Sequence, residues 1–166
     1  EQAQRGENPL MGWVPSVPSN GVDLQPSSDE FGKFERRGLD LAHAVGFVIP
    51  AGGLGERLGF SGVKFALPAE LCTGQTVLQV YAGYILAVQK FAAAQAGRNV
   101  QLPVAIMVSD DTEQGIQKLL EDNNRYGLAK EQVTILKQEK VAALSDSFAT
   151  IAMADEATIA TKPHGH

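Results

Sequence analysis

The stretch from Val45 to Pro68, VGFVIPAGGLGERLGFSGVKFALP, constrains this chain more than any other part of its sequence. A short apolar run rich in Val, Phe and Ile ends abruptly in glycines, which is typical of a buried strand followed by a tight turn. Glycines allow the backbone to approach a ligand closely, because no Cβ stands in the way. Consecutive backbone N–H groups in such a turn form a concavity that binds anions. The stretch therefore predicts a phosphate-binding loop after a buried strand.

Two cationic side chains follow the glycines of this loop. Arg57 comes two residues after Gly55, and Lys64 comes seven residues after Arg57. Cations beside the turn would neutralise a polyphosphate and the charge that develops when it is cleaved. The alternative is a plain turn with solvated cations, since glycine is the ordinary turn residue. The combination of glycines with both cations favours the binding loop.

Two common glycine motifs are absent from the loop. A Walker A loop ends in Gly-Lys-Ser/Thr, whereas here Gly62 is followed by Val63. The dinucleotide fingerprint G-x-G-x-x-G also fails, because the third glycine counted from Gly53 would fall on Leu58.

Strand and helix patterns alternate along the rest of the chain. The predicted strands cover residues 45–50, 103–109 and 132–136, the predicted helices 76–94 and 110–124, and a short strand is expected over 158–161. This alternation predicts an α/β fold, a mostly parallel sheet with helices on both faces. Ligands bind beyond the carboxyl ends of such strands, so the glycine loop, Ser109-Asp110-Asp111 and Gln138 are expected to converge at one rim. Pro50 is expected at the end of its strand, where no ladder donor is needed.

The helix over residues 76–94 carries apolar side chains at three- and four-residue steps. The stripe consists of Val77, Val80, Tyr81, Tyr84, Val88 and Phe91. We expect this stripe, tyrosines included, to lie in the core or at an interface.

The chain up to about residue 28 is predicted to be an irregular arm, since its prolines fit no helix or central strand. Leu10 and Trp13 are expected to pack this arm onto the rest of the chain; stacking of Trp13 against a base or sugar is the alternative. Ser27-Ser28-Asp29 offers an N-cap for a helix to about Ala44, interrupted near Gly38.

The composition is that of a folded globular protein. The chain has 166 residues, of which 44% are hydrophobic and 20% charged, enough for one domain with a core. Its net charge of −5 provides no basic field to attract nucleic acid or an anionic membrane. An anionic nucleotide would therefore be bound by local cations.

Cys72 is the only cysteine, which excludes an intrachain disulfide and fits a reducing compartment. A structural or loop role is favoured for it over a catalytic one, because no histidine lies near it in sequence. No secretory segment opens the chain and no apolar run reaches the ~18 residues of a membrane span, so a cytoplasmic location is expected. The chain begins without Met and stops at His166 inside a motif, so we interpret it as a fragment.

The loop resembles a known signature. Gly52-Gly53-Leu54-Gly55-Glu56-Arg57-Leu58-Gly59 with Lys64 is similar to the nucleotide-binding motif of the nucleotide-sugar pyrophosphorylases (uridylyltransferases), above all the UDP-sugar pyrophosphorylases. Further segments support the resemblance in the family's order: Asn8-Pro9 with Pro15-Ser16-Val17-Pro18, Ser109-Asp110-Asp111-Thr112, Leu136 to Ala142, and Thr161 to His166. The resemblance implies a Rossmann-like, glycosyltransferase-A-like fold, with residues 1–44 as an arm and helix and 45–166 as part of the nucleotide-binding domain.

The reaction implied by the resemblance is the reversible formation of a UDP-sugar and pyrophosphate from UTP and a sugar 1-phosphate. By the same resemblance, Gly52, Gly53 and Leu54 present backbone groups to the uridine and phosphates. Arg57 holds the leaving pyrophosphate as a guanidinium fork, and Lys64 sits near the α-phosphate. Positioning and charge stabilisation supply most of such a rate, so no residue is assigned as nucleophile or general base.

Further nucleotide contacts are implied towards the end of the chain. Gln138 is the expected reader of uracil, because its amide offers one donor and one acceptor, and a surface role is the alternative. Lys140 is assigned to a phosphate contact, and a role as a solvent-exposed surface residue is an equally weighted alternative. Gly165 and His166 are assigned to the nucleotide site, while a metal site of His164 and His166 is disfavoured because a third ligand is lacking.

The resemblance implies Mg²⁺ as the cofactor of the full-length enzyme, held by carboxylates that are not in this chain. Asp110 and Asp111 could approach a ligand or metal, but helix capping is favoured for them. The fragment alone is expected to be inactive and to require the missing C-terminal part of the same protein. The alternatives are a UDP-N-acetylhexosamine or UDP-glucose pyrophosphorylase, the latter disfavoured by Arg57, and a non-catalytic nucleotide-binding module.

Overall fold

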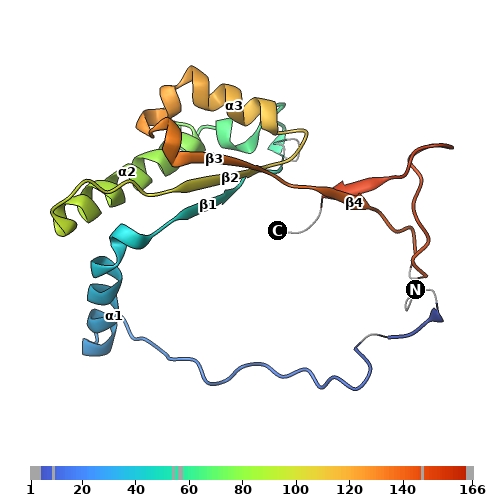
Figure 1. Cartoon of the computed structure of the whole chain (residues 1–166), viewed down its shortest axis with the longest axis horizontal. Coiled ribbons are helices and arrows are strands. Elements are labelled where there is room, and N and C mark those ends of the chain that lie inside the picture. Colours follow the sequence, from blue (N-terminus) through green and yellow to red (C-terminus); the bar gives the residue numbers. More distant parts are fainter. Residues whose placement is uncertain (1–4, 9, 54, 56–57, 147, 164–166) are drawn as a thin grey trace. The chain divides into compact units, whose positions relative to one another are not determined.

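The structure is a computed structural model that describes residues 5–8, 10–53, 55, 58–146 and 148–163. The chain forms two compact units, one of Glu1–Leu24 with Glu139–His166 and the other of Gln25–Gln138. The larger unit contains the glycine-rich loop, the helices α1 (Asp29–Asp40), α2 (Val77–Ala96) and α3 (Glu113–Asp122), and the main sheet (Figure 1). The division of the chain at residue 44 that the sequence suggests stays a prediction.

The main sheet is parallel, with three strands in the order β1 (Phe47–Pro50), β2 (Val104–Val108) and β3 (Val133–Lys137). The register pairs Ile49 with Ile106 and Ile106 with Ile135. Nearly continuous apolar runs of this kind are typical of parallel strands. The predicted α/β class and all three predicted strands are confirmed. Pro50 ends β1 as predicted, and the next residue, Ala51, donates its N–H to the carbonyl of Met107 at 2.6 Å.

Of the two α-helices that follow β1, α2 begins and ends where local chemistry predicts, whereas α3 begins later. Helix α2 (Val77–Ala96) starts at Thr76, whose Oγ1 accepts the N–H of Gln79 at 3.2 Å, and ends at Gly97 with a φ of +62°. Helix α3 (Glu113–Asp122) begins three residues later than predicted, because residues 110–112 form a turn. Short 3₁₀ helices connect these elements: η2 Ala42–Ala44, η4 Lys64–Ala66, η5 Asn124–Gly127 and η6 Lys130–Gln132.

Helices α2 and α3 lie on one face of the sheet (Figure 1). Leu78 and Ile85 from α2 and Ile116 from α3 share one buried core with Ile106 of β2. Right-handed crossovers that step in one direction across a sheet place their helices on the same face. The strand order β1-β2-β3 has no reversal, so the predicted helix cover of the second face is not seen in the described residues. On that face Val48 is 73% exposed.

Most of the apolar stripe that was predicted to lie in the core or at an interface is exposed on α2, with Val77 and Val88 half-buried. Tyr84 is 66% and Tyr81 45% exposed, whereas Leu78, Ala82, Ile85 and Ala92 are buried. Helix α2 is apolar on most of its circumference, so residue spacing alone could not identify the face that packs. By length and composition α2 also meets the criterion for a membrane-crossing helix, which core helices of soluble proteins meet too. This corrects the expectation that no apolar segment reaches that length.

The N-terminal helix differs from expectation in one place. Helix α1 (Asp29–Asp40) is capped by Ser28, whose Oγ accepts the N–H of Phe31 at 3.1 Å, but Gly38 lies inside the helix. The predicted interruption at Gly38 is therefore wrong, and the break comes after Asp40. No helix or strand element precedes α1 in the described residues. Trp13 is 76% and Leu10 63% exposed, and their packing onto the rest of the chain stays a prediction.

The smaller unit contains an antiparallel pair of β4 (Lys140–Ala142) and β5 (Thr161–Pro163). The strand predicted over 158–161 begins only at its last residue, because Ile159 forms an isolated bridge with Met153. Between β4 and β5, the chain makes turns in which aspartate carboxylates accept hydrogen bonds from backbone N–H groups. The Asp146 carboxylate accepts the N–H groups of Phe148 and Thr150, and that of Asp155 accepts the N–H of Ala157.

Candidate active site

The glycine loop leaves the carboxyl end of β1 and is closed by its own backbone. The N–H of Gly55 donates to the carbonyl of Gly62 at 2.9 Å. A Cβ on Gly55 would lie 2.9 Å, and one on Gly62 2.7 Å, from the ring of Phe60. Both glycines are therefore required by the packing of Phe60, a residue to which the sequence analysis assigned no role. The sequence feature that could have indicated this role is an aromatic residue placed between glycines.

Lys64 lies beside the loop as predicted. Its Nζ is 3.2 Å from the point that a Cβ on Gly53 would occupy. The preceding residue, Val63, is 6% exposed and packs against Gly115 of α3, where a Cβ would lie 2.7 Å from a Val63 methyl group. Because its neighbour is buried in the core, the backbone of Lys64 is anchored while its ammonium stays accessible.

Gln138 reaches the same loop from the other side. It is the first residue after β3, and its N–H donates to the carbonyl of Val108 at 2.7 Å. Its side chain is buried, and the Oε1 lies 2.8 Å from the point that a Cβ on Gly52 would occupy. The predicted convergence of the glycine loop with Gln138 is thus observed, and Lys64 lies at the same loop. Gly52 has the amide of Gln138 beside it, and Gly53 has the ammonium of Lys64.

Ser109 forms the floor under Gly52. Its Cβ lies 3.9 Å from the Cβ position of Gly52, and the residue is 3% exposed. Thr112 orients it, because the Thr112 Oγ1 accepts the N–H of Ser109 at 3.0 Å and lies 3.2 Å from its Oγ. The buried hydroxyl pair holds the residue after β2 in a single arrangement.

The charged group at this rim is an ion-pair cluster rather than a helix cap. The Nζ of Lys137 lies 2.7 Å from Asp110 and 3.0 Å from Glu113. Hydrogen bonds to Asp110 and then Glu113 raise the pKa of Lys137. Helix α3 has no side-chain cap bond at Thr112, so the capping role expected for Asp110 is wrong. The sequence could have indicated this ion pairing, because Lys137 lies at the end of a strand and so at the same rim as Asp110.

Residues 30–166 match the family described as UTP–glucose-1-phosphate uridylyltransferase. The chain belongs to this uridylyltransferase family. It is 46% identical over 168 residues to the UDP-sugar pyrophosphorylase of Oryza sativa subsp. indica, covering 99% of this chain and 27% of that protein. It is 30% identical over 139 residues to UDP-N-acetylhexosamine pyrophosphorylase-like protein 1 of Xenopus tropicalis, covering 82% of this chain and 27% of that protein.

The fold of this uridylyltransferase chain is shared with a solved structure. The uridine diphosphate N-acetylglucosamine pyrophosphorylase of Trypanosoma brucei, solved with an inhibitor, superposes with a TM-score of 0.73 at 24% identity. The match covers 87% of this chain and 30% of that one. The Rossmann-like class expected from the sequence is consistent with this likeness.

Five predicted site residues of the uridylyltransferase chain fall outside the described part of the larger unit. Leu54, Arg57, Gly165 and His166 lie outside the described residues. Lys140 is the first residue of β4 in the smaller unit and is exposed. The predicted roles of all five stay predictions.

The described residues of the uridylyltransferase chain do not form a Mg²⁺ site. In these ranges no three side chains of His, Cys, Asp or Glu gather in one place. Asp110, the acid nearest in sequence to the rim of β2, has its carboxylate against the ammonium of Lys137. A divalent cation would have to compete with that ion pair, so no step is assigned to a metal here.

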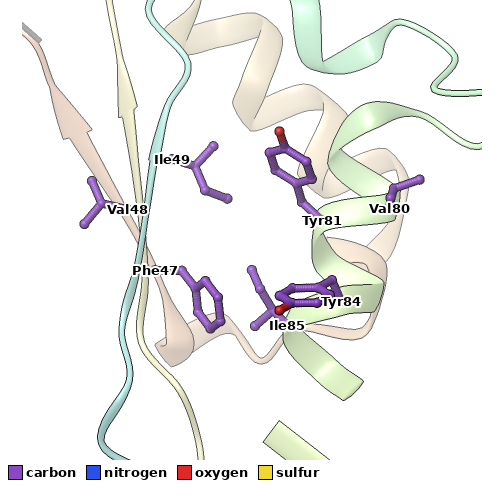
Figure 2. A pocket seen from close by; sticks show the side chains of 7 residues that line it. All are labelled: Phe47, Val48, Ile49, Val80, Tyr81, Tyr84 and Ile85. Atoms are coloured by element: carbon purple, nitrogen blue, oxygen red, sulfur yellow. The ribbon is translucent and has the colours of Figure 1, made fainter. Parts of the chain in front are cut away.

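An apolar groove lies between β1 and α2 (Figure 2). Figure 2 shows Phe47 and Ile49 pointing from β1 towards Tyr81 and Tyr84 of α2, while Val48 points to the opposite side of the strand. The hollow measures ≈ 400 Å³ and its seven lining residues carry no charge. A polyphosphate would find no cation there, so the groove is not the nucleotide site.

Proposed function

We propose that these residues form the UTP-binding part of a UDP-sugar pyrophosphorylase, which makes UDP-sugars from UTP and sugar 1-phosphates. The observation that carries this proposal is the pairing of Gly52 with the amide of Gln138 and of Gly53 with the ammonium of Lys64. Two adjacent glycines thus lie beside an amide, which we assign to the base, and beside an ammonium group, which we assign to a phosphate. The chain spans 27% of the length of the rice relative, so the activity is proposed for a full-length protein.

The proposed reaction is an in-line displacement at the α-phosphorus of UTP. An oxygen of the sugar 1-phosphate forms a new bond to the α-phosphorus. The bond between the α-phosphorus and the oxygen that bridges to the β-phosphate breaks, and pyrophosphate leaves with that electron pair. Little proton transfer is needed, so positioning and electrostatic stabilisation supply most of the rate. We assign Lys64 to the charge that grows on the α-phosphate and Arg57 to the leaving pyrophosphate, because a guanidinium fork matches two phosphate oxygens.

We assign base recognition to Gln138. Its carboxamide has an acceptor and a donor that match the N3–H and a carbonyl oxygen of uracil. Cytosine has an acceptor at N3 and an amine in place of one carbonyl, so it presents the reversed donor–acceptor pattern and would require the Gln138 carboxamide to be turned over. Burial of Gln138 supports this assignment, since the amide has little solvent to replace a mismatched base.

The remaining sites are proposed on the family resemblance. Leu54, Lys140, Gly165 and His166 would complete the nucleotide contacts. Mg²⁺ would be held by carboxylates outside these 166 residues and would neutralise the phosphates when bound. A cytoplasmic location is proposed as well.

We also propose that the rest of a longer polypeptide covers the groove between β1 and α2. Tyr84 is 66% exposed there, and the relative from rice is several times longer than this chain. Covering apolar area stabilises a fold by about 25 cal/mol per Å². In a full-length protein, Tyr81 and Tyr84 should therefore resist chemical labelling that modifies them readily in the 166-residue chain. Equal labelling in both would contradict the proposal.

The alternative within the family is a UDP-N-acetylhexosamine or UDP-glucose pyrophosphorylase. The higher identity to the UDP-sugar enzyme, 46% against 30%, favours the first assignment. The test is pyrophosphate release from UTP by a full-length protein that carries this sequence, with several sugar 1-phosphates. Turnover of glucose, galactose and pentose 1-phosphates is expected; turnover of N-acetylglucosamine 1-phosphate alone would favour the alternative. UTP binding without any turnover would indicate a non-catalytic nucleotide-binding module.

A further inference from the structure

We propose that Gly52 is a positioning residue for base selection, because its missing side chain leaves the space in which the Gln138 amide sits. The inference rests on the proposed function, in which Gln138 reads uracil. The Oε1 of Gln138 lies 2.8 Å from the point that a Cβ on Gly52 would occupy, closer than real Cβ contacts come. Gly52 thus accommodates a protein side chain as well as a nucleotide.

The surroundings of Gln138 limit how far its side chain can move away from Gly52. Its backbone N–H is bound to the carbonyl of Val108 at 2.7 Å, so the start of the side chain cannot move away. The residue is 7% exposed, which limits the alternative rotamers of its amide. Ser109 closes the floor at 3.9 Å from the same Cβ position. A methyl group on Gly52 would therefore push the amide sideways by several tenths of an ångström.

Such a shift would spare the fold and damage recognition. The atom displaced is the end of a side chain and not backbone, so the structure can accommodate the methyl group at little cost. Hydrogen bonds to a base weaken steeply when distance and angle change by this amount. Gly52→Ala should therefore change which base is accepted more than it changes stability.

Gly53 offers a matched control in the same loop. A Cβ there would meet the Nζ of Lys64 at 3.2 Å, at the end of an exposed and flexible side chain. Gly53→Ala is expected to lower turnover with UTP and CTP by the same factor, because Lys64 faces the phosphates that both nucleotides share. The ratio of kcat/KM for UTP to that for CTP should then be unchanged.

The test is a double-mutant cycle in the full-length protein, read as that UTP-to-CTP ratio. Because both rates come from one preparation, the ratio does not depend on how much of a variant is folded. Gly52→Ala is expected to lower the ratio about 10-fold, since small misplacements of a binding group have effects of this order. In a Gln138→Ala background, Gly52→Ala should lower it no further, because the displaced amide is already absent.

Two results would overturn the inference. The first is an unchanged ratio in Gly52→Ala. The second is a loss of the same size in both backgrounds, which would mean that the methyl group blocks the nucleotide directly. If the unsubstituted protein shows no UTP preference and releases no pyrophosphate, the proposed function fails and this inference fails with it. If the protein prefers UTP but the effects of Gly52→Ala and Gln138→Ala on the ratio are additive, only the role proposed for Gly52 is refuted.

Discussion

The ammonium of Lys64 lies 3.2 Å from the point that a Cβ on Gly53 would occupy. The two residues are far enough apart in sequence that the loop between them must fold back, and the Gly55–Gly62 backbone bond of 2.9 Å makes it do so. A cation is thereby held next to a backbone that has no side chain to keep a phosphate away.

Lys64→Ala should lower turnover of the full-length protein by about 10²–10³-fold, the usual loss when one preorganised charge at a reacting centre is removed. The steady-state rate of pyrophosphate release measures this, and circular dichroism checks that the fold is intact. Lys118→Ala is the matched control, because that lysine pairs with Asp122 on the exposed face of α3 at 2.8 Å. A near-normal rate for Lys64→Ala would remove this residue from the mechanism.

Gln138→Ala should reduce the preference for UTP over CTP by roughly 10- to 100-fold, because a lost base-reading hydrogen bond is worth about 1–3 kcal/mol. Competition between the two nucleotides in one assay measures the preference. Exposed Gln101→Ala should leave it unaltered. Base preference that survives Gln138→Ala would show that another group reads the uracil.

Gln132→Ala should destabilise the fold by about 1–3 kcal/mol without changing base preference. Gln132 is 3% exposed, and its Nε2 donates to the carbonyl of Leu102 and to the Oε1 of Gln89, both at 2.7 Å. Its truncation removes this donor from the buried carbonyl of Leu102 and leaves the Oε1 of Gln89 with the N–H of Leu102 as its donor. Urea unfolding measures the loss, and a midpoint equal to that of the unsubstituted chain would contradict it.

The turns of the smaller unit should weaken in acid. Hydrogen bonds from the backbone N–H of Thr150 and, to a smaller degree, of Phe148 hold the pKa of Asp146 below its ordinary 3.8. The backbone N–H of Ala157 does the same to the pKa of Asp155. A folded-state pKa below the unfolded value means that the stabilisation is fully present above pH 3.8 and is lost as pH falls through the folded-state pKa.

Carboxyl chemical shifts followed by NMR should thus give midpoints below 3.8 for both residues. The same titration in urea is the control and should return both to ordinary values. Folded-state midpoints at or above 3.8 would show that these turns are not closed by their carboxylates.

Features that depend on a few neighbouring residues were predictable. Ser28 and Thr76 were recognised as helix starts because a hydroxyl that caps a helix acts within three residues. The strands were recognised because parallel strands are apolar on both sides. Given parallel strands, the rim on which the glycine loop and Gln138 meet follows from chain direction alone.

Features that depend on distant parts of the chain were not predictable. Spacing could not decide whether Leu78 and Ile85 or Tyr81 and Tyr84 would be buried, because both sets are apolar at helical steps. The helices cover one face because the strand order happens not to reverse within these residues.

The amino-acid sequence by itself determined the strands, the N-caps of α1 and α2, the family and the meeting of the glycine loop with Gln138 at one rim, since each follows from local chemistry and chain direction. Only the tertiary structure decided which glycine accommodates which partner: Gly52 the Gln138 amide, Gly53 the Lys64 ammonium, and Gly55 the Phe60 ring. The physical reason is that a missing Cβ acquires a role only from the atom that fills its space, and packing brings that atom from elsewhere in the chain.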